Sequence, residues 1–164
     1  VAVVTSPLQR CRETAAAVLA AQPTPPSIQV ERALNECDYG DWQGRSLREL
    51  AKDKRWRVVQ QQPSAAGFPG GETLAQMQAR ATAAVRRIDR EVTEAHGAGA
   101  VWVAVSHGDV IKAVLADALG LHLDLFQRIV ISPCSVSAIL VGPGGPIVLA
   151  VNSTGDDLKA LVPS

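Results

Sequence analysis

The chain has 164 residues, 47% hydrophobic and 4% aromatic, and its 16 Lys and Arg residues balance 16 Asp and Glu residues. That length suits one domain with a sizeable core. The formal net charge of zero argues against nucleic acid and anionic membranes as partners, because both are bound through summed positive charge. No apolar run approaches the roughly 20 residues of a membrane span, and no signal-peptide pattern is visible.

The predicted elements alternate between strands and helices. In chain order we predict a strand at 1–5, a helix at 8–21, a strand at 27–31, a loop at 34–44, a helix at 46–62, a loop at 63–71, a helix at 72–96, a strand at 101–105, helices at 110–119 and 124–129, and strands at 136–141 and 147–152. Ser46 and Glu49 have the spacing of a capping box, and Gly97 is expected to end the long helix.

The order of these elements predicts an α/β fold, a three-layer sandwich with a mostly parallel sheet in a single domain spanning 1–164. The runs VAVVT and VWVAV lack polar alternation, which is typical of strands covered on both faces. Ligands of such sheets bind beyond the carboxyl ends of the strands, on the turns that lead into helices. Two turns have that form, at residues 6–10 and 106–109.

These turns and one loop contain the candidate site residues. Arg10 and His107 follow strand ends, where helix N–H groups and an arginine fork favour phosphate oxygens. Gly108 would let the backbone approach a bound oxyanion. Each residue also has an ordinary interpretation, Arg10 as a surface arginine, His107 as a structural hydrogen-bonding residue and Glu36 as a loop carboxylate. We interpret His96 and His122 as structural.

The three cysteines, Cys11, Cys37 and Cys134, are too few and too widely spaced for a disulfide framework or a zinc site. We therefore expect free thiols in a reducing, cytoplasmic setting. Cys11 and Cys134 are interpreted as small buried apolar residues.

Four motifs together resemble those of the histidine phosphatase superfamily, the phosphoglycerate-mutase-like family. The motifs, in chain order, are SPLQRCRETA at 6–15, LNECDYGDWQG at 34–44, GGET at 70–73 with Arg80, and SHG at 106–108. They resemble the family's SPLxRAxxTA signature, its LxExxxGxWxG loop, its GGES…R helix start and its second catalytic histidine. The resemblance implies a phosphoglycerate-mutase-like sandwich.

One family motif is missing from the chain. The family's nucleophile is a histidine in an Arg-His-Gly triplet at the end of the first strand, and none of the three histidines here stands in such a triplet. The only methionine is Met77, so the chain does not begin with an initiator. We interpret residues 1–164 as a member that lacks the family's first strand, catalytic loop and first helix. Alone, it is expected to expose strand edges and to fold poorly.

For an intact protein, the resemblance implies phosphomonoester hydrolysis through a phosphohistidine intermediate. Arg10 would clamp the phosphoryl group with the Gly108 N–H as a further donor, and His107, best as an imidazolium, would donate a hydrogen bond to it. Glu36 would act as general acid and then as base, which requires a raised pKa. A small phosphorylated metabolite is the expected partner, no cofactor or metal is implied, and a homodimer is left open beside a monomer.

Two alternatives remain open, a cofactor-dependent phosphoglycerate-mutase-like phosphomutase and a non-catalytic phosphate- or protein-binding member. Mutases carry a basic residue directly after the loop glutamate, where this chain has Cys37, and the GxWxG form with Trp42 is more usual in phosphatases. A cluster at Lys52, Lys54, Arg55 and Arg57 is interpreted as either a clamp for a second acidic group or a solvated helix face. Trp56 and Phe68 belong to the segment that shapes specificity in this family.

Overall fold

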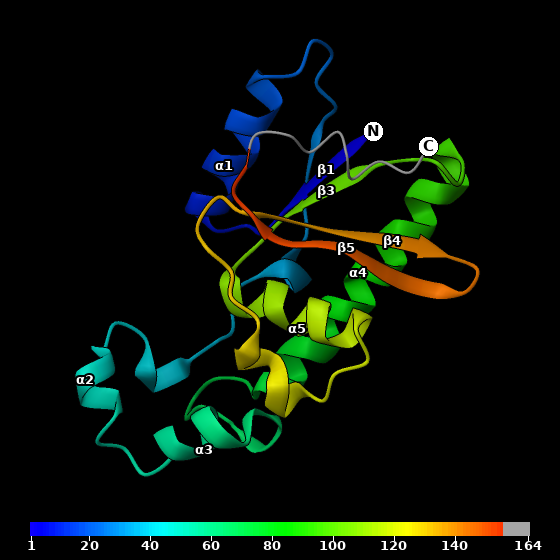
Figure 1. Cartoon of the computed structure of the whole chain (residues 1–164). Helices are drawn as coiled ribbons and strands as arrows, with labels where there is room; N and C mark the ends of the chain where they lie inside the picture. The colour runs from blue at the N-terminus through cyan, green and yellow to red at the C-terminus, as the bar shows by residue number, and fades with distance from the viewer. Residues whose placement is uncertain (156–164) are drawn as a thin grey trace.

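A parallel sheet of three strands forms the centre of the fold. The computed structural model describes residues 1–155 (Figure 1). Strand β1 (Ala2–Thr5) lies between β2 (Ile28–Val30) and β3 (Trp102–Val105), and both neighbours run parallel to it. Strands β4 (Val136–Gly142) and β5 (Gly145–Ser153) form a separate antiparallel hairpin. The predicted α/β class with a parallel sheet is confirmed.

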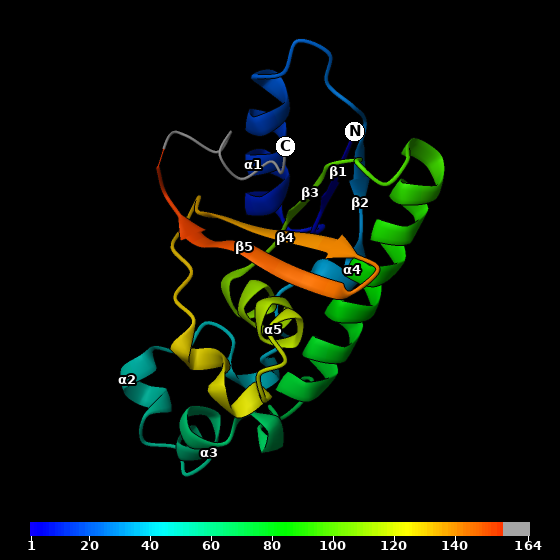
Figure 2. The same ribbon diagram turned by 45° about the vertical axis from the view of Figure 1, so that its right-hand side comes forward.

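Helices cover both faces of the parallel sheet, which gives three layers. Helix α1 (Gln9–Ala20) packs Cys11, Ala15 and Leu19 against Val3 and Val105. On the opposite face, α4 (Leu74–His96) packs Ala84, Ile88 and Val92 against Ala2 and Val4. Figures 1 and 2 show α1 and α4 on opposite sides of β1. The alternating side chains of β1 therefore fill two separate apolar clusters, as its uninterrupted apolar sequence predicted.

The remaining helices are short. They are α2 (Leu47–Leu50), α3 (Trp56–Gln61), α5 (Gly108–Ala118) and the 3₁₀ turns η1 (Arg32–Leu34), η2 (Gly40–Trp42), η3 (Pro63–Ala65) and η4 (Leu123–Arg128). The capping box of Ser46 and Glu49 is confirmed. The predicted helix at 46–62 is interrupted, because the Asp53 side chain accepts the Arg55 N–H at 2.9 Å and stabilises a turn between α2 and α3.

The start of α4 lies two residues later than predicted. Thr73 and Gln76 form a second capping box, which fixes Leu74 as the first helical residue. Gly97 ends the helix with a φ of +91°, as expected from its position. The first turns of α4 pack with α5 in the largest apolar cluster, in which Met77, Leu115 and Phe126 are fully buried.

Two predictions of burial were wrong. The run VWVAV was predicted to be covered on both faces, but Val101 is 62% and Val103 39% exposed. The reason is that β3 is an edge, since no strand within residues 1–155 pairs with its other side. Cys134 is exposed rather than buried, because it occupies a tight turn with a φ of +60°. The described part of the chain contains no helix with the length and apolar character of a membrane span.

Candidate active site

The carboxyl ends of β1 and β3 bring Arg10 and His107 together. Thr5 pairs with Val105 in parallel register, and the Ser6 N–H continues the ladder with a 2.9 Å hydrogen bond to the Val105 carbonyl. Each strand then turns into a helix, with Arg10 in the first turn of α1 and His107 at the N-cap of α5. Residues 97 positions apart thus meet at one edge of the sheet.

The imidazole of His107 is buried and hydrogen-bonded at both ring nitrogens. Arg10 donates to Nδ1 from Nε at 3.1 Å and from Nη2 at 2.8 Å. Because a guanidinium can only donate, Nδ1 is an acceptor and the ring hydrogen is assigned to Nε2, 2.8 Å from the Ser6 hydroxyl. Ser6 in turn donates to the Asn35 side-chain oxygen at 3.0 Å. The chain of hydrogen bonds fixes both the ring plane and its tautomer.

These surroundings favour a neutral His107. Burial, with smaller contributions from the charges of Arg10 and Arg80, lowers the pKa of His107 from its ordinary 6.5 to about 4. The imidazolium implied by the resemblance is therefore not the favoured form at neutral pH here. The side chain of Arg10 remains 62% exposed, so its guanidinium is accessible from solvent.

Glu36 is the third group at this edge. Its Oε2 lies 3.9 Å from Arg10 Nη2 and 3.8 Å from His107 Nδ1, and its Oε1 accepts the Cys37 N–H at 3.1 Å. Burial raises the pKa of Glu36 and the charge of Asp109 adds to the increase, while the hydrogen bond from Cys37 and the charge of Arg10 oppose it. A carboxyl group with a raised pKa can hold a proton and donate it.

An ion pair between Arg80 of α4 and Glu72, in the turn before that helix, holds the loop that carries Glu36. The guanidinium of Arg80 donates to Glu72 from two nitrogens and also donates to the carbonyls of Ala33, at 2.7 Å, and Glu36, at 3.1 Å. Glu72 also accepts the Asp38 N–H at 3.0 Å. The pair therefore contacts the loop backbone on both sides of the Glu36 side chain, which fixes its direction.

Two glycines allow this loop to contact the turn before α4. A Cβ on Gly40 would lie 2.1 Å from the Pro69 carbonyl oxygen, and a Cβ on Gly71 would lie 2.1 Å from the Asp38 carbonyl oxygen. The two backbones instead exchange hydrogen bonds, from Asp41 N–H to Pro69 and from Glu72 N–H to Asp38. The motifs LNECDYGDWQG and GGET thus meet directly, and only glycine fits at their contact.

The structure brings Arg10, Glu36 and His107 together, and Gly108 begins α5 beside them with open space where a Cβ would lie. The motifs predicted no role for Ser6, Arg80 or Glu72, although all three residues belong to them. The motifs show which residue types are present, but these residues pair across motifs, and a motif by itself does not show which residue of another motif it contacts.

No group of His, Cys, Asp and Glu side chains within residues 1–155 is arranged to hold a metal ion.

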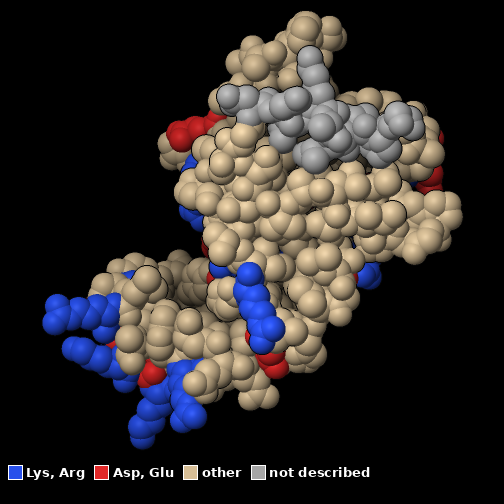
Figure 3. Space-filling model, viewed as in Figure 1, with Lys and Arg blue, Asp and Glu red and all other residues tan. Residues whose placement is uncertain are grey.

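The basic cluster in the turn between α2 and α3 and at the start of α3 is a solvated surface. Lys52, Lys54, Arg55 and Arg57 are exposed, and Figure 3 shows cationic side chains that project outward over these two helices. Arg55 pairs with Asp53 at 2.6 Å and lies over the Trp42 ring. Trp56 and Phe68, expected to shape specificity, both pack against Trp42. The rings of Trp42, Trp56 and Phe68 therefore form one aromatic cluster, which stabilises the segment that contains α2 and α3.

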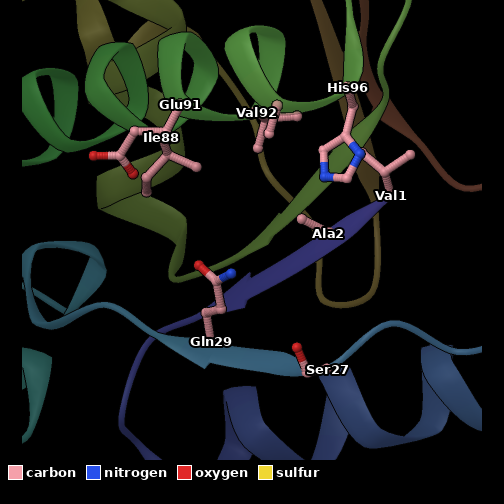
Figure 4. Close-up of a pocket in the computed structure, with 9 residues that line it drawn as sticks. Val1, Ala2, Ser27, Gln29, Ile88, Glu91, Val92 and His96 are labelled. Carbon is pink, nitrogen blue, oxygen red and sulfur yellow. The ribbon is translucent and has the colours of Figure 1, made fainter.

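A cavity of about 240 Å³ lies at the opposite end of the parallel sheet. Figure 4 shows it between the amino ends of the strands and the last turns of α4, where His96 and Glu91 line it with Gln29. His96 is exposed, and so is His122, which caps η4 by accepting the Asp124 N–H. Neither histidine belongs to the site at the carboxyl ends.

A model of the histidine phosphatase superfamily, branch 1, matches residues 1–154. Among curated proteins, the bifunctional protein Rv2228c of Mycobacterium tuberculosis is 33% identical over 160 residues, which are 94% of this chain and 41% of that protein. The chain therefore spans less than half the length of the curated relatives it matches.

Solved structures share the fold. YhfR of Bacillus stearothermophilus has a TM-score of 0.77 at 29% identity, over 92% of this chain and 72% of that one. The mycobacterial glucosyl-3-phosphoglycerate phosphatase Rv2419c has a TM-score of 0.80 at 22% identity, over 94% and 77%. A putative alpha-ribazole-5'-P phosphatase of Escherichia coli has a TM-score of 0.78 at 22% identity, over 96% and 75%.

Proposed function

This chain belongs to the histidine phosphatase superfamily, and we propose that it is the part of a phosphomonoester hydrolase that binds the phosphoryl group and delivers a proton to the leaving group. The observation that supports the proposal best is the convergence of Arg10, Glu36 and His107 at one edge of the sheet, with Oε2 of Glu36 within 4 Å of both other groups. The phosphatase names of several structural neighbours agree with it.

Arg10 and the start of α5 would bind the phosphoryl oxygens. The Arg10 guanidinium presents a fork that matches two of these oxygens, and the first N–H groups of α5 have no acceptor within their own helix. Catalysis of phosphoryl transfer rests mainly on positioning and on stabilising charge at these oxygens. His107 keeps its Nε2 hydrogen on Ser6, so it would donate to the phosphoryl group from Nδ1, after gaining a proton there when a phosphate dianion replaces the contact with Arg10.

Glu36 would protonate the leaving alkoxide. Burial raises the pKa of its carboxyl group, which is the direction that a general acid working near neutral pH requires. In the second step the same carboxylate would accept a proton from the water that attacks the phosphoenzyme. The site thus combines a cationic clamp with a proton donor on neighbouring segments.

The attacking histidine would come from a part of the natural protein outside these 164 residues. The chain contains no Arg-His-Gly triplet, and His96 and His122 lie away from the site. The sequence of the gene upstream of Val1, together with the intact mass of the native protein, tests this point. A native protein that hydrolyses phosphomonoesters without such a triplet would contradict the phosphohistidine route.

The assay for the function is ³¹P NMR of the complete protein with several phosphomonoesters in EDTA. We expect free phosphate from more than one ester, and no 2-phosphoglycerate from 3-phosphoglycerate in the presence of 2,3-bisphosphoglycerate. The outward direction of Lys52, Lys54, Arg55 and Arg57 supports this outcome over the mutase, which would need cations around a second acidic group. Isomerisation with little free phosphate would establish the mutase, and absence of both would favour a phosphate-binding protein.

A further inference from the structure

The first turn of α5 carries a carboxylate that the proposed mechanism does not use. Asp109 accepts a hydrogen bond at 2.9 Å from the hydroxyl of Tyr39, which lies three residues after Glu36 in the same loop. On its other side, Asp109 contacts Lys112 at 3.3 Å. Asp109 therefore connects the loop that carries the proposed proton donor to the helix that begins at the phosphate site.

We propose that Tyr39 and Asp109 are positioning residues for Glu36, which hold its loop on α5 and place a second carboxylate beside the proton donor. The inference rests on the proposed function, because it concerns how Glu36 delivers a proton. Arg80 of α4 and Glu72, just before that helix, contact the loop backbone, whereas Tyr39 anchors its side chain on α5. The loop is thus held from two helices.

The contacts around Tyr39 and Lys112 make this connection rigid. The Tyr39 ring packs edge-on against Phe68, with centroids 5.0 Å apart. Lys112 donates to the Gln127 side chain at 3.2 Å and lies over the Phe126 ring, which is fully buried. Because both ends of the connection are packed against the core, movement of Asp109 is restricted, and its charge stays at a fixed place relative to Glu36.

The effect of Asp109 on the pKa of Glu36 depends on all the charged and titratable groups that face Glu36. Those groups are Arg10 from α1, Arg80 from α4, His107 and Asp109 from α5, and Cys37 and Tyr39 from its own loop. Burial raises the pKa of Glu36 most, the hydrogen bond from Cys37 and the two arginines lower it, and Asp109 is the carboxylate whose charge adds to the increase. Without Asp109, the pKa of Glu36 would be lower, and less of the carboxyl group would hold the proton that it has to donate.

The experiment compares Asp109→Asn and Tyr39→Phe in the complete protein, with Asp117→Asn as a matched control. Asp117 lies on the same helix and pairs with Arg86 on the surface. An asparagine retains an acceptor for Tyr39 and removes only the charge. A phenylalanine removes the hydroxyl and retains both the charge and the ring that packs on Phe68.

With an alkyl phosphate, kcat of Asp109→Asn is expected to fall about tenfold at neutral pH, a part of the 10²–10⁴-fold that general acid catalysis contributes. KM should stay near its original value, because proton donation acts in the transition state. The basic limb of the pH profile should move to lower pH. Tyr39→Phe should lower kcat about threefold, and the basic limb of its pH profile should stay close to that of the wild type. Both variants should lose less on p-nitrophenyl phosphate, whose leaving group hardly needs a proton.

A second measurement does not depend on activity. Titration of the Glu36 carboxyl carbon by ¹³C NMR, assigned with Glu36→Gln, is expected to give a lower pKa in Asp109→Asn than in the wild type and in Asp117→Asn. An unchanged pKa, or equal losses of kcat on both substrates, would overturn the inference. A wild-type protein without hydrolase activity would instead defeat the proposed function, while the titration would still decide whether Asp109 acts on Glu36.

Discussion

The two ends of the parallel sheet contain similar side chains in different surroundings. At the carboxyl ends, His107 is buried, bonded at both ring nitrogens and within 4 Å of Glu36. At the amino ends, His96 and Glu91 line a cavity, but both are exposed. A histidine, a carboxylate and a cavity are therefore not enough to define a site. The hydrogen-bond network that fixes their geometry distinguishes the two ends.

The direction of the helices adds to this difference. Helices α1 and α5 begin at the carboxyl ends of the strands, so their free N–H groups and positive dipole ends face the site. Helix α4 ends near the opposite cavity, with His96 in its last turn. Anions are favoured at helix starts and disfavoured at helix ends. The same sheet thus has one end suited to phosphate and one that is not.

The largest expected effect is the loss of a group at the carboxyl ends. In the complete protein, Arg10→Ala and His107→Ala should each lower kcat by about 10²–10³, the scale for removing one preorganised donor to a developing charge. His96→Ala, at the other end, is the matched control and should keep kcat near that of the wild type. Steady-state kinetics with phenyl phosphate provides the measurement, and equal losses at both ends would contradict the assignment.

Next in size is the leaving-group dependence of Glu36→Gln. We expect kcat to fall about 10²-fold on alkyl phosphates and only a few-fold on p-nitrophenyl phosphate, because a phenolate leaves without a proton. Glu91→Gln serves as the control at the amino ends and should change neither value. A loss of the same size on both substrates would show that Glu36 is not the general acid.

The ion pair that holds the Glu36 loop should matter for stability as well. Glu72 and Arg80 have side chains that are 18% and 25% exposed, so Arg80→Ala leaves a half-buried carboxylate and two carbonyls without their donor. We expect a loss of about 2 kcal/mol in the free energy of unfolding. Arg86→Ala breaks the surface pair with Asp117 and should cost less than about 1 kcal/mol. Urea unfolding compares the two, and similar losses would refute the role of the inner pair.

The smallest effect concerns pH. The pKa of His107 is lowered from its ordinary 6.5 to about 4 in the folded protein. Between pH 4 and pH 6.5, the unfolded chain therefore binds a proton at this histidine that the folded protein does not bind. Stability contributed by the neutral ring is present above pH 6.5 and is lost as the pH falls toward 4. The free energy of unfolding should therefore fall less steeply in this window for His107→Gln than for the wild type. His96→Gln is the control, and identical slopes would contradict the buried neutral ring.

Local patterns determined much of what could be predicted. The apolar run at β1, the capping box of Ser46 and Glu49, and the glycine that ends α4 depend on neighbouring residues only, so the sequence contains them directly. The resemblance of four motifs to one family placed Arg10, Glu36 and His107 among the candidates, and the rule that parallel strands gather their carboxyl ends explains why they meet. The interruption between α2 and α3 was missed, because one Asp53 side chain decides it.

By itself, then, the sequence determined the order of strands and helices, the family and the residue types at the site. Tertiary structure alone decided the exposed face of β3, the neutral state of His107 and the raised pKa of Glu36. It also decided the contacts of Arg80 with Ala33, 47 positions away, and of Tyr39 with Asp109, 70 positions away. Burial and the distance between charges depend on which segments pack together, and no local pattern in the chain contains that information.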